Sequence, residues 1–170
     1  MLARTRINAA DLGVTEAHLD ALERCRDELR SGRIRHWQGR LDLTHVEGEE
    51  GYFFSMATWH RALHRRIRPA EFTECGSVCC IGGWTAFYCG AEWEYPTRPH
   101  HPALHELFNM SKYLDDMSDR LEVMRRVTPL QAAAAIDDVL YGGGWPRWED
   151  HLKENEHGVL PATRKIRSRA

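Results

Sequence analysis

The sequence contains no long run of apolar residues. Its longest uncharged segment, residues 75–91, is too short for a membrane-spanning helix, which takes about 20 residues. The first residues, MLARTRINAADLG, lack the apolar stretch of a secretory signal. The cysteines number five, and this odd number without a secretory signal favours a reducing compartment over a disulfide-linked protein. We therefore expect a cytoplasmic protein that does not bind membranes.

The chain also lacks the patterns of the common catalytic sites. It has no Ser-His-Asp order of a hydrolase, no phosphate-binding glycine loop and no zinc-protease motif. Its net charge is −2, with an acidic middle between two mildly basic flanks, which argues against a protein devoted to nucleic acid. We expect a non-enzymatic accessory protein that acts by binding another macromolecule, with an unidentified protein as the partner.

Helix signals dominate the sequence. The clearest begins at Thr128, which can cap a helix with Pro129 in its first position and Gln131 in a capping box. Thr15 precedes another segment with apolar residues at helical spacing, which ends at Gly32. Both segments predict helices with defined ends.

From these signals we predict a mainly α fold. A single-domain helical bundle would cover residues 1–160, and the basic end, 161–170, would be a disordered tail. Segments 40–46 and 51–57 flank the polar turn EGEEG and predict at most a small β-hairpin. The second of these segments also fits a helix, since Met56 begins a set of apolar residues spaced as on one helical face.

Residues 75–90, CGSVCCIGGWTAFYCG, contain four of the five cysteines and no charged residue. We predict a helix here, capped by Ser77 and buried all round, because it offers no polar face to solvent. Adjacent glycines destabilise a helix by roughly 1 kcal/mol each, so close packing of another backbone must compensate. On this interpretation the cysteines are core residues, and Cys25, at the polar border of the first helix, is the accessible one. The smallest side chains would form one stripe of the helix: Cys79, Gly82, Gly83 and Ala86.

Zinc binding competes with this core interpretation. The cysteine ligands would be Cys75 and either Cys79 or Cys80. The histidine ligands would be His60 and His64, which lie one helical turn apart if their segment is helical. The C-x₃-C spacing is less typical than C-x₂-C and no second cysteine pair exists, so we expect no cofactor. A further histidine pair has the same spacing: His101 and His105.

Thiol catalysis is the other competing interpretation. The string CGSVCC resembles the CGSC of papain-type proteases, whose nucleophile lies at a helix N-terminus, where the thiolate is favoured. An extra valine breaks this match, and His151 and His157 lie too near in sequence for that family. A metal- or thiol-dependent enzyme that uses Cys75, Cys79 or Cys80 with a histidine is our alternative function.

Three motifs occur in a fixed order along the chain. They are F-x-M-x-x-W, C-G-x-x-x-C-I-x-G-W-x-A and, after a Leu-Phe pair, T-P-x-Q-A-A-x-x-I-D. Their residues are Phe54, Met56, Trp59, Cys75, Gly76, Cys80, Ile81, Gly83, Trp84, Ala86, Leu107, Phe108, Thr128, Pro129, Gln131, Ala132, Ala133, Ile136 and Asp137. With this set, most of residues 15–145 resembles a group of small uncharacterised proteins found in bacteria and their phages.

The resemblance implies a shared fold and no established activity. It also implies that Cys75 and Cys80 are the recurring cysteine pair, and it suggests a phage- or prophage-borne modulator of host machinery. The long segment between Trp59 and Cys75 departs from the spacing of that group, so the resemblance assigns no role to His60 or His64.

Three weaker candidates for binding lie elsewhere. The arginine-rich segment 61–68 could bind nucleic acid, a further alternative, although we favour the solvated side of an amphipathic helix. Trp145 and Trp148, in a glycine-rich loop, could form a ligand platform, but we expect one indole to cap the core. The arginines of the basic segment are Arg61, Arg65, Arg66 and Arg68. An acidic turn without the spacing of a calcium loop contains Asp115, Asp116 and Asp119.

Overall fold

The structure is a computed structural model and describes residues 5–37, 45–46, 52–57, 76–90, 102–108 and 117–153. It is mainly helical, as predicted. The helices are α1 (Ala9–Leu12), α2 (Glu16–Arg30), α4 (Ile81–Cys89), the short 3₁₀ helix η3 (Pro102–Leu104), α5 (His105–Phe108), α6 (Met117–Arg126), α7 (Pro129–Tyr141) and α8 (Trp148–Lys153). The strands are β1 (Ile34–His36), β2 (His45–Val46), β3 (Tyr52–Phe54) and β4 (Gly76–Cys79). Among the described helices, none has the length and apolar character needed to cross a membrane.

The two longest helices begin at the predicted caps. In α2, the Thr15 hydroxyl accepts the His18 backbone N–H, and the His18 ring accepts the Thr15 N–H. In α7, the Thr128 hydroxyl accepts the Gln131 N–H, and the Gln131 amide oxygen accepts the Thr128 N–H over 2.8 Å. Pro129 occupies the first helical turn. Both predictions are confirmed, because these bonds involve residues only three positions apart.

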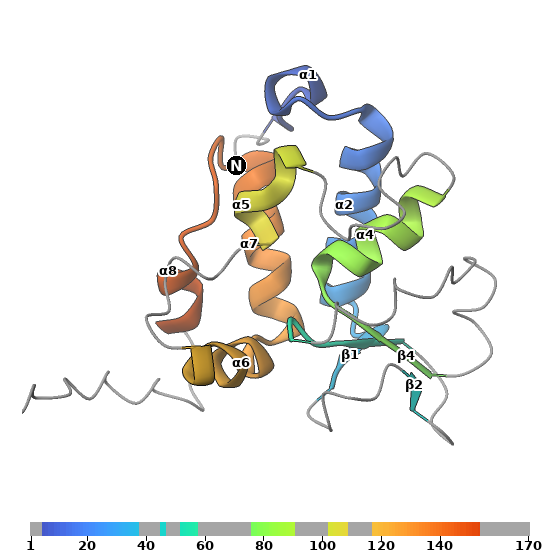
Figure 1. Cartoon of the computed structure of the whole chain (residues 1–170). Coiled ribbons are helices and arrows are strands. Elements are labelled where there is room, and N and C mark those ends of the chain that lie inside the picture. The colour runs from blue at the N-terminus through green and yellow to red at the C-terminus, as the bar shows by residue number, and fades with distance from the viewer. Residues whose placement is uncertain are drawn as a thin grey trace, which may run out of the picture.

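The core lies between these helices and one face of a small sheet. Both α4 and α7 pack against α2, and the three helices stand on the same side of the sheet (Figure 1). Leu22, Trp84 and Ile136 are fully enclosed there. The indole N–H of Trp84 donates to the backbone oxygen of Phe53 over 3.0 Å, so the largest side chain of α4 is also tied to β3.

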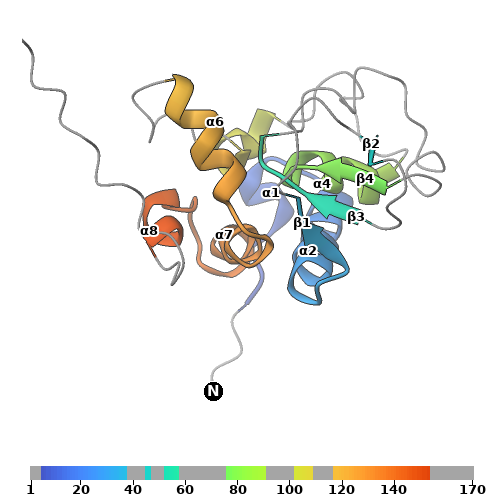
Figure 2. The same ribbon diagram turned by 90° about the horizontal axis from the view of Figure 1, so that it is seen from below.

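The sheet has the strand order β1-β3-β4-β2 and is seen from below in Figure 2. β3 runs parallel to both β1 and β4, whereas β2 runs antiparallel to β4. The strands at 45–46 and 52–54 therefore do not form the expected hairpin with each other, since β4 lies between them. Both strands pair with β4 instead. The pairing of β3 with β4 joins residues about 25 positions apart, such as Tyr52 and Ser77, and local turn chemistry cannot reveal so distant a partner.

The helix predicted over 75–90 begins later than expected. Its first part is strand β4, Cys80 is the N-cap in place of Ser77, and α4 starts at Ile81. A short uncharged segment fits a buried strand or a buried helix equally well, and β4 gains backbone hydrogen bonds from strands on both sides. The prediction of burial is confirmed for residues 79–86, which are all buried, whereas residues 87–90 are only half-buried.

Candidate functional site

The cysteines at positions 25, 79 and 80 are enclosed in the core. Cys25, Cys79 and Cys80 are each at most 2% exposed. Burial raises the pKa of all three thiols, that of Cys80 to about 12, although backbone amides at the start of α4 oppose this shift for Cys80. A nucleophilic cysteine needs a lowered pKa and access to solvent. These three thiols have the opposite environment, with raised pKa values and almost no solvent access.

The prediction that Cys25 is accessible was wrong. Cys25 lies on the side of α2 that is covered by other core residues, and its exposed fraction is zero. Helical spacing places it at the border of the polar face, but α4 and α7 both pack against α2 and bury more of its surface than one apolar stripe. Among the cysteines that the structure describes, Cys89 at the end of α4 is the most exposed and is half-buried.

Of the possible zinc ligands, Cys79, Cys80 and His105 lie within the described part of the chain. Within that part, the structure contains no group of three or more His, Cys, Asp or Glu side chains placed to hold a metal ion. The other candidates from the sequence lie outside the described residues: His60, Arg61, His64, Arg65, Arg66, Arg68, Cys75, His101, Asp115, Asp116, His157 and the tail 161–170.

Trp145 and Trp148 differ sharply in burial. Trp148 opens α8, is fully buried, and donates its indole N–H to the backbone oxygen of Leu107 in α5 over 3.3 Å. Trp145 is 38% exposed. The interpretation that one indole caps the core is confirmed, and Trp148 is therefore a core residue and not part of a binding surface.

The loop that carries Trp145 is held at both ends. Pro146 directly after it is buried. Helix α8 is tied back to α7 by a contact of 2.7 Å between His151 Nε2 and Asp138 Oδ2. The Gln131 side-chain amide also donates to the backbone oxygen of His151 over 2.6 Å. Trp145 is thus an exposed indole on a short loop between two anchored helices.

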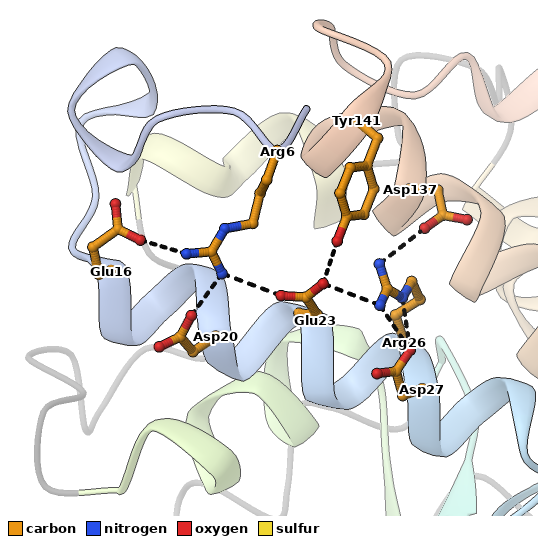
Figure 3. Close-up of polar contacts among 8 residues, drawn as sticks. All are labelled: Arg6, Glu16, Asp20, Glu23, Arg26, Asp27, Asp137 and Tyr141. Atoms are coloured by element: carbon orange, nitrogen blue, oxygen red, sulfur yellow. Dashed lines mark hydrogen bonds and ion pairs between the residues drawn. The ribbon is translucent and has the colours of Figure 1, made fainter. Parts of the chain in front are cut away.

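The last turn of α7, where this loop begins, is fixed by the N-terminal segment. The Ile7 N–H donates to the backbone oxygen of Leu140 over 2.8 Å. The neighbouring Arg6 reaches across to three carboxylates of α2 (Figure 3). Its guanidinium lies 2.6 Å from both Glu16 and Asp20 and 3.2 Å from Glu23.

Glu23 joins this N-terminal contact to α7. Its carboxylate accepts hydrogen bonds from the Tyr141 hydroxyl and, over 3.2 Å, from Arg26 (Figure 3). The Tyr141 bond is the main reason that the pKa of Glu23 lies below its ordinary value. Arg26 is only 10% exposed, lies 3.3 Å from Asp137 of α7 and stacks over the Tyr141 ring at 5.2 Å. Sequence reasoning missed this network, although an arginine beside the apolar stripe of α2 was a signal for it.

Large apolar side chains are exposed at two places in the described structure. Besides Trp145, Leu130 in the first turn of α7 is 65% exposed. The two residues flank opposite ends of a 13-residue helix, so they do not form one patch. Of the two, only Trp145 is placed on a loop with buried residues on its C-terminal side.

Comparisons of the chain with protein-family models, curated proteins and solved structures found no match. The resemblance to small bacterial and phage proteins therefore stays a prediction.

Proposed function

We propose that the protein is a non-enzymatic accessory protein that binds another macromolecule through the Trp145 loop. The observation that carries this proposal is an exposed indole, 38% accessible, on a loop between two anchored helices. Tryptophan is among the residues that contribute most to binding energy at protein interfaces. A side chain on a constrained loop also loses less conformational entropy on binding than one on a mobile segment.

A protein with an apolar pocket is the partner that fits this surface. Arg147 lies two residues after Trp145, is well exposed, and makes a loose contact of 3.4 Å with Asp150. Arginine and tryptophan are both enriched at interface hot spots. The resemblance to bacterial and phage proteins supports a phage- or prophage-borne modulator of host machinery, acting in the cytoplasm.

Affinity capture from a native host lysate tests the proposal. The tagged full chain is compared with Trp145→Ala and with Arg33→Ala, an exposed control whose partner is Glu28 of α2. We expect a protein that is retained by the parent and the control, and that is retained roughly tenfold less by Trp145→Ala, as a loss of about 1.4 kcal/mol would cause.

Two results would count against the proposal. Equal capture by all three chains would show that Trp145 does not contribute to binding. One equivalent of zinc in the same preparations, together with metal-dependent turnover, would favour the enzyme alternative.

A further inference from the structure

The face of the sheet that points away from α2 and α4 carries a separate group of side chains, two of them aromatic and two of them polar or charged. Strand register places Arg35 of β1 beside Phe53 of β3. The Trp37 N–H completes the last of these pairs, His36 with Phe54, by donating to the backbone oxygen of Phe54 over 2.8 Å. The same register, continued by one residue, places Trp37 beside Ser55. Side chains alternate between the two faces of a strand, so one face holds Arg35, Phe53, Trp37 and Ser55.

The Phe53 ring organises this group. The Arg35 guanidinium lies over the ring, 4.6 Å from its centroid. The Trp37 indole meets the same ring edge-on, with centroids 5.4 Å apart and planes at 70°. Both side chains are thus held against one aromatic platform, which places a positive charge and an indole N–H on the same small area of the sheet.

Two polar atoms in this group are buried and unpaired. In the part of the chain that the structure describes, Trp37 Nε1 and Ser55 Oγ lack hydrogen-bond partners, and Ser55 is 1% exposed. Folded proteins pair nearly all of their buried polar groups, because an unpaired one destabilises the fold. These two atoms belong to adjacent positions on neighbouring strands, so one shared partner is the simplest way to satisfy both.

We propose that this face binds a small oxyanion, either a carboxylate or a phosphate group. An indole N–H can only donate, a serine hydroxyl can donate, and Arg35 supplies a positive charge, so the three side chains match an acceptor that carries negative charge. A metal cation would face the indole N–H, which cannot coordinate it, and the positive charge of Arg35, which would repel it. The site lies at the carboxyl end of the parallel strands β1 and β3, the edge at which ligands bind in open parallel sheets.

Nuclear magnetic resonance of the ¹⁵N-labelled full chain tests this proposal. The indole N–H signals of the six tryptophans are recorded, and that of Trp37 is assigned with Trp37→Phe. Sodium phosphate and sodium acetate are titrated in separate samples at constant pH and ionic strength. We expect a saturable shift of the Trp37 signal, while that of the buried Trp148 stays in place. Saturation with phosphate alone, or with acetate alone, identifies which oxyanion the site takes.

Matched variants separate a built site from general ion binding. Ser55→Ala and Arg35→Gln should each weaken binding at least about tenfold. Arg33→Gln, at an exposed arginine that precedes β1 and pairs with Glu28 of α2, should leave it unchanged. If Ser55→Ala does not fold, the exposed Arg35 tests the site by itself. The proposal is overturned if neither anion shifts the Trp37 signal, if all indole signals move together, or if Arg35→Gln binds like the parent. In those cases the two polar atoms bind water only.

Discussion

A Cβ atom on Gly83 would lie 2.9 Å from the Cβ atom of Cys79. Gly83 is in the first turn of α4 and Cys79 is the last residue of β4, so the contact closes the turn that joins strand to helix. The sequence predicted that another backbone would approach this glycine closely. The approaching group is instead the side chain of Cys79, which was itself expected on the same helical stripe.

Replacing Gly83 by leucine should destabilise the protein by about 1–3 kcal/mol, because the added atoms overpack a core that has no space for them. Gly144→Ala is the matched control, since a Cβ atom there would have nothing within 4 Å. Urea denaturation of the three chains measures the difference. A Gly83→Leu chain as stable as the parent would show that the close contact is not required.

The buried cysteines should resist alkylation in the folded protein. Burial raises the pKa of Cys80 to about 12 and also raises the pKa values of Cys25 and Cys79, so their thiolate fractions near pH 7 are very small. Of the four described cysteines, Cys89 should react first, and all should react after denaturation. Peptide mass spectrometry at several reaction times gives the order. Fast labelling of Cys79 or Cys80 at neutral pH would instead support thiol chemistry.

The two tryptophans of the 145–148 segment should differ sharply in their effect on stability. Trp148→Ala removes a fully buried side chain and its hydrogen bond to Leu107, and we expect a loss of about 3–5 kcal/mol. Trp145→Ala should change stability by only about 0.5 kcal/mol, as is usual for surface positions. Thermal melting of both variants is the measurement. A large loss for Trp145→Ala would mean that its indole supports the fold.

Tyr141→Phe should destabilise the protein in a pH-dependent way. The Tyr141 hydroxyl lowers the pKa of Glu23 from its ordinary value of 4.5, so the bond favours the ionised carboxylate in the folded state. Its contribution, about 1–3 kcal/mol for a charged acceptor, is present above pH 4.5 and is lost as the pH falls through the lower pKa of the folded state.

The difference between parent and Tyr141→Phe should therefore be largest near neutral pH and shrink in acid. Denaturation at pH 7 and at acid pH measures it, and the same substitution in a Glu23→Gln background is the control. A difference that does not vary with pH would assign the effect to packing of the phenol ring.

Local chemistry decided where the two longest helices begin. The caps at Thr15 and Thr128 depend on side chains only three residues away, so residue types alone predicted where α2 and α7 begin. The strong uncharged character of residues 76–90 likewise predicted burial, because no charged group has to reach solvent.

Contacts between distant segments decided the rest. Whether Gly76–Cys79 is strand or helix depends on β3 and β2, which provide its hydrogen bonds from both sides. Cys25 is buried because other elements pack on α2, and Trp148 rather than Trp145 enters the core because Leu107 of α5 accepts its indole N–H. These outcomes are set by backbone pairing and by the shape of neighbouring elements. A local sequence pattern does not contain that information, since it specifies only how polar each residue is and how its nearest neighbours interact.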